Sequence, residues 1–567
     1  MNTNRMTEER RSWILCAAFA VTVNALLIHF PRIFASLYCP PNDLYLHYYS
    51  AQEFARALSE GVSQPRWAPD MFGGLGAPLF VYYPPLYYYA VSFFHWLTGD
   101  MWNAIRAVDF ISNSLCGFLV MLFFRKWGMA FHRGWIAAML VQCAPFFLLN
   151  LGYVNGLPWQ AANVWMCLLL FAAADDPGNR ARLDLRITIA MAGLSLTHLL
   201  STFMALACLP IAILFASWAG GFGWKKVLLR CVSWGASALL GLFLAAFFLL
   251  PALTTSSLIN TQKWRDELDW RAGFLCPLFT KPTWVIFQYG VGLCLVAGVI
   301  ICAIAIRKMD RTNPLRRAAV LLISTAIAAL FWSSEISYPL WSALVPLQIL
   351  QYPYCFFQIA SIATACVLVL TLMASSRDMP PWLRMTHRLA IVLWFLLAGG
   401  IWLKILLRDG RPVRPDIPAF AQLMLNQREY LPARPQKGWQ DYLASGALTG
   451  ECQRAGARLA EQNVTVHRRS WNIVATRSCA IRLPLFAYPC WCGTQDGAPV
   501  EWQKDTASGL VICALTAGAH VIEMTWSGWP MQKPGRIVSL AAIAALAVIT
   551  TIRRGRLLTS RAGAGKA

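Results

Sequence analysis

The sequence predicts a polytopic α-helical membrane protein with a β-rich domain before its last helix. Of its 567 residues, 57% are hydrophobic and 13% are charged, whereas a soluble protein carries about 25% charged residues. Apolar runs near the ~20 residues that cross a bilayer recur along most of the chain. Between residues 408 and 535 the charge rises, and apolar and polar residues alternate with period two, which is typical of β-strands.

The number of spans depends on how residues 79–97 are interpreted. This segment holds five tyrosines, a double proline, His95 and Trp96, and amphipathic rings favour the headgroup layer. We therefore expect it to lie in the outer interface and not to cross. The remaining twelve spans are expected near residues 13–34, 104–124, 133–150, 158–174, 187–200, 201–218, 228–250, 284–305, 318–334, 353–374, 388–407 and 536–552.

Twelve spans with the N-terminus inside place nearly every dense Lys/Arg cluster on the cytoplasmic side, as the positive-inside rule favours. Residues 187–218 are the difficult part, because 32 residues must make two short crossings or dip in from outside near Leu194–Thr202. We expect a membrane domain over residues 1–407, with a first outer loop at 35–103. A mixed, then β-sandwich-like outer domain follows over 408–535, and a last helix with a basic tail over 536–567.

The net charge of +22 comes from 49 basic and 27 acidic residues. Most of the basic residues form short clusters between apolar segments, where anionic lipid is the natural partner. Membrane lipid therefore explains the charge, and nucleic-acid binding is not expected.

The first outer loop holds the candidate reaction centre. Pro40 and Pro41 suit the first turn of a helix, and Asn42 or Asp43 suits its N-cap. In such a helix Asp43 and His47 stand four residues apart on one face. An acid and an imidazole at a membrane surface could take or hold a proton.

The order of motifs resembles the GT-C class of integral-membrane glycosyltransferases. More narrowly, it is similar to the bacterial YfhO-like and "6-pyruvoyl-tetrahydropterin synthase-related" membrane proteins. The motifs that carry this likeness are Asp43 with His47, Pro65-Arg66-Trp67, Gly73–Gly76 leading to Tyr82-Tyr83-Pro84-Pro85, Thr197-His198-Leu199, Gln351-Tyr352-Pro353-Tyr354, Glu429-Tyr430-Leu431-Pro432, and the run from Tyr488 to His520.

The resemblance implies an inverting transferase that takes a sugar from a polyprenyl-phosphate carrier on the outer face of a bacterial inner membrane. It implies Asp43 as the general base. The acceptor would be a glycan, lipid or protein of the cell envelope. The second outer loop, residues 151–157, lacks the acid that many such enzymes use, which argues against a metal-dependent mechanism. No cofactor is expected, and a divalent metal is the alternative that this argument disfavours. Cys355 stands where related chains carry an arginine, which argues against phosphate contact there.

Each further candidate has a structural alternative. Asp43 could simply cap its helix, worth about 1 kcal/mol, and His47 could be a surface histidine. Asp70 could pair with Arg66, and the tyrosines could be interface anchors. His198 could be tied to a neighbouring helix, since a polar group in an apolar segment needs a partner. The candidates for substrate contact are Arg66, Asp70, Tyr82, Tyr83, His198, Lys263, Arg265, Arg271 and Tyr352; Arg56 is a rival for phosphate.

Two other functions fit the same composition. One is a transporter or flippase of a lipid-linked saccharide, although the spans carry few charges and no paired interrupted helices are evident. The other is a non-catalytic envelope assembly protein whose β domain binds carbohydrate or a partner. Sugar transfer that depends on Asp43 separates the enzyme from both.

Overall fold

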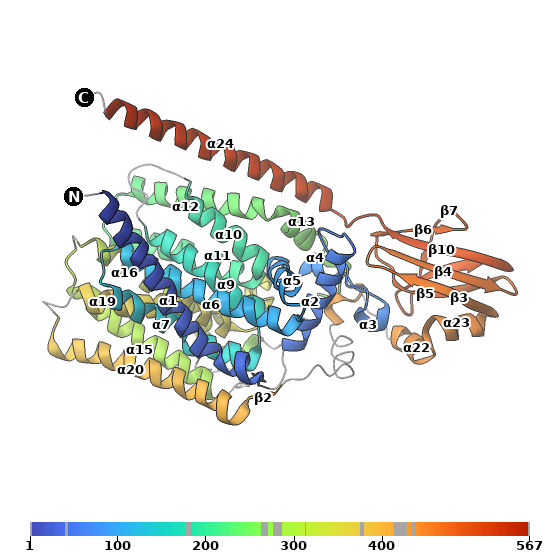
Figure 1. The fold of residues 1–567 in the computed structure, drawn as a ribbon, viewed down its shortest axis with the longest axis horizontal. Helices are drawn as coiled ribbons and strands as arrows, with labels where there is room; N and C mark the ends of the chain where they lie inside the picture. The colour runs from blue at the N-terminus through green and yellow to red at the C-terminus, as the bar shows by residue number, and fades with distance from the viewer. Residues whose placement is uncertain are drawn as a thin grey trace. The chain divides into compact units, whose positions relative to one another are not determined.

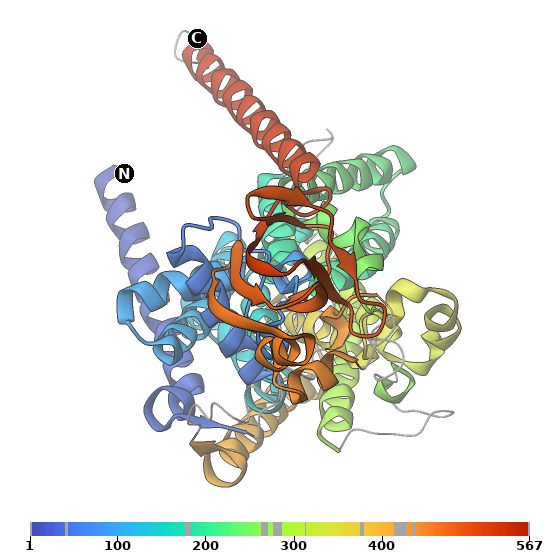
Figure 2. The ribbon, with the colours of Figure 1, turned by 90° about the vertical axis from the view of Figure 1, so that its right-hand side faces the viewer.

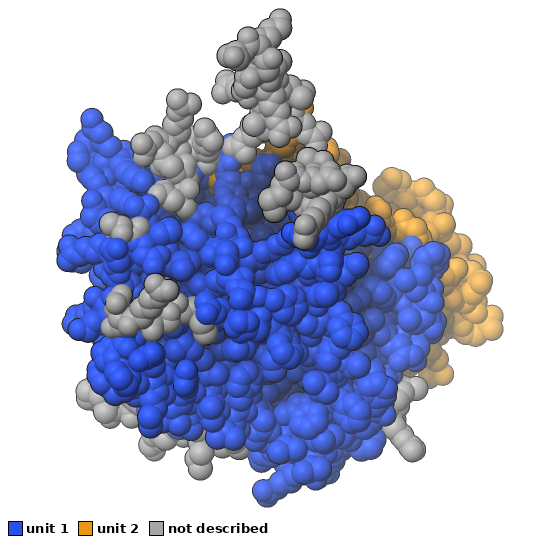
Figure 3. All heavy atoms as spheres, turned by 60° about the vertical axis from the view of Figure 1, so that its left-hand side comes forward, with its two compact units in different colours: residues 1–59, 85–235, 262–426 blue, residues 60–84, 236–261, 427–567 orange. Residues whose placement is uncertain are grey.

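The computed structural model describes residues 3–39, 43–175, 183–261, 270–275, 286–311, 313–374, 379–412, 428–433 and 438–564. The chain forms two compact units, coloured separately in Figure 3. Unit 1 comprises Met1–Ser59, Pro85–Gly235 and Gln262–Asn426. Unit 2 comprises Glu60–Pro84, Ala236–Thr261 and Gln427–Ala567.

Unit 1 is a bundle of long apolar helices (Figure 1). Its main helices are α1 (Thr3–Ala35), α2 (Leu44–Ser59), α5 (Leu86–Thr98), α6 (Met101–Lys126), α7 (Phe131–Gln142), α8 (Pro145–Leu149), α9 (Leu157–Ala174), α10 (Leu185–Thr197), α11 (Leu199–Ala219), α15 (Ile286–Lys308), α16 (Pro314–Ser333), α17 (Tyr338–Ala343), α18 (Val345–Gln348), α19 (Phe357–Ala374) and α20 (Pro381–Lys404). Short 3-10 and π turns join several of them: η1 (Asn150–Val154), η3 (Trp270–Gly273), η4 (Glu335–Ser337), η5 (Pro353–Phe356) and η6 (Ile405–Asp409). Strands β1 (Leu37–Tyr38) and β2 (Arg411–Pro412) pair antiparallel, and α12 (Trp224–Leu244) continues from unit 1 into unit 2.

Within the described part of the chain, eleven helices are long and apolar enough to cross a membrane. They are Glu8–Ala35, Met101–Lys126, Phe131–Val154, Leu157–Ala174, Leu199–Ala219, Trp224–Leu244, Tyr289–Lys308, Pro314–Ser333, Pro353–Leu372, Pro381–Asp409 and Gln532–Ile552. Helix α10 is the twelfth of the expected spans. With 13 residues it is about 20 Å long, shorter than the ~30 Å hydrocarbon core.

The segment at residues 79–97 does not form a spanning helix. It contains α4 (Leu79–Tyr82) and the 13-residue α5. Tyr83 between them has an extended backbone, with φ −96° and ψ 127°. Because the X-Pro geometry of the double proline disfavours a continuous helix, the segment divides into two pieces that are each too short to cross.

Unit 2 holds a two-sheet β structure, seen from its own side in Figure 2. Its strands are β3 (Ala457–Val464), β4 (Arg468–Ala475), β5 (Cys479–Phe486), β6 (Trp491–Gln495), β7 (Ala498–Val500), β8 (Gln503–Lys504), β9 (Leu510–Leu515) and β10 (Gly518–Trp526). One sheet has the order β3-β4-β10-β6-β7 and the other β5-β9-β8. The other elements of unit 2 are α3 (Met71–Gly74), α4, α13 (Ala246–Thr254), η2 (Ser256–Leu258), η7 (Arg428–Tyr430), α22 (Gly438–Ala444), α23 (Ala447–Ala455) and α24 (Gln532–Ala564).

The strand patterning is visible in the burial of alternate residues. On β4, Trp471, Ile473 and Ala475 are buried, as are Ile481 and Leu483 on β5. Strands β6 and β7 pair antiparallel up to Gln495 opposite Ala498. The two residues between them, 496 and 497, have φ of 54° and 81°, the left-handed geometry that an Asp-Gly hairpin turn requires. Residues 465–467 form the turn between β3 and β4.

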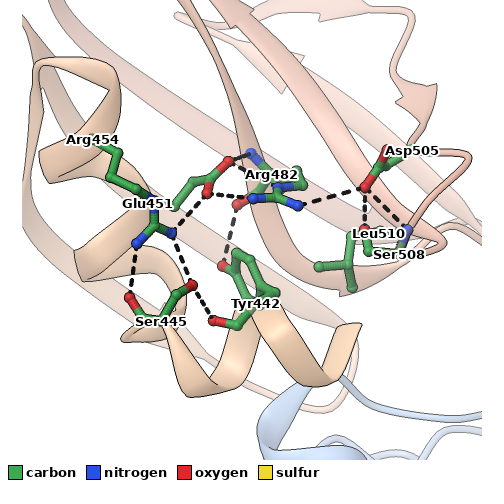
Figure 4. Close-up of polar contacts among 8 residues, drawn as sticks. All are labelled: Tyr442, Ser445, Glu451, Arg454, Arg482, Asp505, Ser508 and Leu510. Atoms are coloured by element: carbon green, nitrogen blue, oxygen red, sulfur yellow. Dashed lines mark hydrogen bonds and ion pairs between the residues drawn. The ribbon is translucent and has the colours of Figure 1, made fainter. Parts of the chain in front are cut away.

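An ionic network joins helices α22 and α23 to the second sheet (Figure 4). Glu451 on α23 accepts hydrogen bonds from Arg482 Nε at 2.9 Å and Nη2 at 2.8 Å, and from Arg454 Nη2 at 3.1 Å. The Tyr442 hydroxyl donates to the Arg482 carbonyl at 3.2 Å. Arg482 also approaches Asp505 at 3.8 Å. The network fixes the α22–α23 hairpin on strand β5.

The glycine-rich turn at residues 73–76 is held by strand β4. Arg469 is fully buried, and its guanidinium donates to the carbonyls of Gly74 at 2.7 Å and Pro69 at 2.9 Å. A Cβ on Gly76 would lie 2.5 Å from the ring of Trp67, and its φ is +78°. The turn therefore uses glycine to pack a buried tryptophan.

Candidate functional site

Asp43 lies directly before helix α2 in unit 1. Its carbonyl accepts the amide of His47 at 3.0 Å, which is the first helical bond, and its own amide donates to the carbonyl of Val154 at 3.2 Å. The helix follows because Leu44, Ala51 and Phe54 are buried at helical spacing. Asp43 itself is half-buried. The expected helix start is thus found; residues 40–42, which include both prolines, lie outside the described residues.

His47 is buried one turn into α2, with 1% of its surface exposed. Its Nδ1 lies 3.1 Å from the hydroxyl of Tyr88 on α5. Burial, and then the nearby His198, lower the pKa of His47 to about 3. The imidazole is therefore neutral at physiological pH, which makes it a hydrogen-bonding group and not a cation for phosphate.

The charge of Asp43 influences two tyrosines, Tyr88 and Tyr352. Burial raises the pKa of Tyr88 and the Asp43 charge adds to the rise, while a hydrogen bond with Ser50 lowers the pKa. Burial, Cys355 and Asp43 likewise raise the pKa of Tyr352. The negative charge of Asp43 thus helps to raise the pKa of both phenols, so they keep their protons and remain hydrogen-bond donors.

His198 occupies the break between α10 and α11, with φ −153° and ψ 104°. Its Nδ1 accepts the amide of Ser201 at 3.3 Å, which caps α11. Ser201 donates its hydroxyl to Gln358 on α19 at 2.7 Å. The imidazole stacks on Trp159 with 5.6 Å between centroids and 13° between planes. The imidazole ring is thus fixed by the helix cap, the ring contact and the polar link to α19. Its Nε2 has no hydrogen-bond partner among the described residues.

Arg271 and Tyr352 lie on packed segments of unit 1. Arg271 is exposed, and its guanidinium lies 5.1 Å from the centre of the Trp270 ring. A Cβ on Gly273 would lie 3.2 Å from the Cβ of Tyr352. The turn that carries Arg271 therefore packs on Tyr352, whose pKa the Asp43 charge raises. Lys263 and Arg265 lie outside the described residues.

The other candidates belong to unit 2. Arg66 is 2% exposed and donates to the carbonyls of Phe80 at 3.2 Å and Phe247 at 2.6 Å, which favours a structural role. Tyr82 donates to the carbonyl of Thr255 at 2.7 Å. Tyr83 is half-buried, and Asp70 is exposed before α3. These four side chains belong to unit 2, whereas the cluster of residues around Asp43 and His198 described above belongs to unit 1.

The sequence interpretation missed several residues of this cluster. Tyr88 was one ring in an aromatic run, and Trp159 and Gln358 were apolar-segment residues without a motif. Arg32 and Asp109 carried a usable signal, because an ionisable residue inside an apolar span is a functional candidate by default. In the described ranges, no three His, Cys, Asp or Glu side chains gather in a way that could hold a metal ion.

A groove follows the second half of α2. It has a volume of about 760 Å³ and is lined by Gln52, Arg56, Tyr89, Phe93 and Trp96, among others. Phe93 and Trp96 are 55% and 78% exposed. The groove therefore combines apolar rings with a few polar groups, the usual composition of a ligand pocket.

The fold defines a class: a polytopic helical membrane protein with a β-rich region before a final apolar helix. A family model described as "6-pyruvoyl-tetrahydropterin synthase related domain; membrane protein" matches residues 80–407. This is more than half of the chain, and the protein belongs to that family. No curated protein matches the chain.

Solved structures give partial likenesses. The arabinofuranosyltransferase AftD from Mycobacteria is 16% identical with a TM-score of 0.41; the match covers 71% of this chain and 28% of that one. The Archaeoglobus fulgidus oligosaccharyltransferase in the apo form is 13% identical with a TM-score of 0.43, covering 73% and 59%. ArnT from Cupriavidus metallidurans, bound to undecaprenyl phosphate, is 13% identical with a TM-score of 0.36, covering 73% and 77%. This chain thus spans less than two thirds of the first two.

Proposed function

We propose that the protein is a membrane glycosyltransferase that moves a sugar from a polyprenyl-phosphate carrier to a cell-envelope acceptor on the outer face of a bacterial inner membrane. The observation that carries the proposal is the placement of Asp43. Asp43 is half-buried and stands directly before a helix, outside the candidate spans. Its main chain is hydrogen-bonded to the buried His47, and its charge raises the pKa values of Tyr88 and Tyr352. A general base needs this kind of fixed, partly desolvated position.

The proposed reaction is a direct displacement with inversion. The Asp43 carboxylate takes the proton of an acceptor hydroxyl as the acceptor oxygen forms a bond to the anomeric carbon. The bond from that carbon to the phosphate oxygen breaks, and the polyprenyl phosphate leaves with the electron pair. The phenols of Tyr88 and Tyr352 donate hydrogen bonds, and Arg271 supplies a positive charge for the phosphate. The groove along α2 offers an apolar surface to the prenyl carrier.

The test is a transfer assay on the purified full chain in lipid nanodiscs. Polyprenyl-phosphate sugars, radiolabelled in the sugar, are offered with and without envelope extracts as acceptors. Release of free sugar and incorporation into larger products are both measured. We expect one donor to be consumed, and Asp43→Asn to lower that rate by about 10²–10⁴-fold with donor binding retained.

The matched control is Asp100→Asn. Asp100 is an exposed N-cap whose carboxylate accepts the amide of Asn103 at 2.7 Å, and asparagine caps as well as aspartate. If Asp43 were only a cap, both variants would behave alike. Donor binding without any chemistry would instead favour a transporter or an assembly protein, and movement of the bound donor across the bilayer would favour the transporter.

A further inference from the structure

Arg32 is a charged residue in the last turn of α1, with 4% of its surface exposed. Its Nη1 forms an ion pair at 3.0 Å with Asp109 of α6, which is 3% exposed. Its Nη2 donates to the carbonyl of Leu151 and, at 2.7 Å, to the Oδ1 of Asn155. The guanidinium also lies 4.8 Å from the centre of the Tyr38 ring. One side chain thus joins α1, α6, β1 and the turn at 150–156.

Such a pair is costly in this position. Arg32 and Asp109 both lie within candidate spans, where ionisable side chains are rare and usually serve a function. A buried ion pair often adds no net stability over apolar residues of similar volume. The pair is therefore better explained by the geometry that it imposes than by the stability that it adds.

The first chain of contacts from Arg32 to Asp43 runs through the turn at residues 150–156. Asn155 has φ 58° and ψ 33°, and its amide donates to the carbonyl of Asn150 at 2.7 Å. The preceding residue, Val154, presents its carbonyl to the Asp43 amide at 3.2 Å. Arg32 binds both ends of the turn, at Leu151 and Asn155. The turn lacks an acid of its own, but it fixes the main chain of the candidate base.

The second chain of contacts starts at Asp109 and runs through helix α5 to His47, which follows Asp43 on α2. The hydroxyl of Tyr87 donates to Asp109 Oδ1 at 3.3 Å. The Tyr87 ring lies 5.7 Å from that of Tyr88, whose hydroxyl is 3.1 Å from His47 Nδ1. Asp109 thus orients Tyr87 and, through the ring contact, Tyr88, and both rings lie next to His47.

We propose that Arg32 and Asp109 form a positioning pair that holds Asp43 in place, through Val154 on one side and through Tyr87 and Tyr88 on the other. The inference rests on the proposed function for its effect on catalysis. The structural part of the inference does not depend on the proposed function, because it concerns only the contacts that hold the main chain of Asp43.

The test uses two conservative variants of the full chain in nanodiscs. Arg32→Lys keeps the positive charge beside Asp109, but an ammonium group cannot reproduce the planar fork that reaches two further acceptors. Asp109→Asn keeps an acceptor for Arg32 and Tyr87 but removes the charge. The control is Gln142→Met, which removes buried hydrogen bonds to Asn24 and Asn113. Gln142 lines the same small cavity as Asp109 and Leu151, but among the residues that the structure describes it has no hydrogen bond to Arg32, Asp109 or residues 150–156.

Hydrogen–deuterium exchange at Asp43 is the first readout. Because its amide bonds Val154, we expect exchange in peptides covering Asp43 and residues 150–156 to accelerate about tenfold in Arg32→Lys. Asp109→Asn should act in the same direction, and Gln142→Met should leave these peptides unchanged. Unaltered exchange at Asp43 in either folded variant would overturn the inference, as would an equal change in the Gln142→Met control.

Turnover is the second readout. Misplacement of a reacting group by about 1 Å can cost about 100-fold in rate, so kcat should fall by that order in Arg32→Lys while KM for the donor changes by less than about twofold. A parallel loss of donor binding would contradict a positioning role. A wild-type protein without any transferase activity would refute the proposed function, and exchange at Asp43 would then decide the positioning pair by itself.

Discussion

Replacing His47 with glutamine should remove a pH-dependent part of the protein's stability. His47 has a pKa lowered to about 3 in the folded protein, through burial and then His198, against about 6.5 when unfolded. Below pH 6.5 the His47 imidazole is protonated in the unfolded chain but stays neutral in the folded protein. The free energy of unfolding therefore falls as the pH falls. At pH 5, 1.5 units below 6.5, the loss is about 2 kcal/mol at 1.36 kcal/mol per unit.

The assay is thermal unfolding in nanodiscs between pH 8 and pH 5. Wild type should lose about 2 kcal/mol more of its free energy of unfolding than His47→Gln over this range. His132→Gln is the control, since that side chain is exposed in the folded protein. Equal pH dependence in wild type and His47→Gln, or an imidazole signal that titrates near its ordinary value and vanishes in His47→Gln, would refute a neutral, buried His47.

Three further substitutions test other contacts. Gly76→Ala places a methyl 2.5 Å from the ring of Trp67 at φ +78°, so the free energy of unfolding should fall by about 2 kcal/mol or more; an unchanged melting temperature would contradict this packing. Glu451→Gln leaves Arg482 and Arg454 without their shared carboxylate and should lower the free energy of unfolding by about 2 kcal/mol. This loss should shrink in acid, because the two arginines lower the pKa of Glu451 against the effect of burial. An equal loss at all pH values would contradict the role of the carboxylate charge. Tyr88→Phe keeps the ring but removes the hydroxyl at His47 and should lower transfer about tenfold with unchanged donor affinity, which a full-rate variant would disprove.

The fold could be predicted where local chemistry decides it. Apolar runs locate the spans because backbone polar groups must be satisfied within each helix in lipid. The double proline before Leu86 predicts that residues 79–97 cannot cross as one helix. Asp496-Gly497 predicts its hairpin because the turn needs two positive φ values. Each of these features depends on a few neighbouring residues, so one sequence suffices.

The candidate site was harder to predict because it depends on distant contacts. The pattern at Asp43 and His47 was visible, but the partner of His47 lies 41 positions away on α5. Arg66 was a candidate for substrate contact from its motif alone, and its hydrogen bond to the carbonyl of Phe247, 181 positions away, could not be foreseen. The break at His198 could be placed within a few residues, whereas its stacking on Trp159 could not. Side-chain partners between helices follow from tertiary packing, which periodicity does not encode.

The most direct measurement is the rate at which purified wild type and Asp43→Asn consume a polyprenyl-phosphate sugar in nanodiscs, with Asp100→Asn as the reference. We expect the wild type and Asp100→Asn to turn over at similar rates and Asp43→Asn to be slower by about 10²–10⁴-fold, while all three bind the donor and unfold at similar temperatures. Turnover by Asp43→Asn at the rate of the reference variant would contradict the assignment of Asp43 as the base.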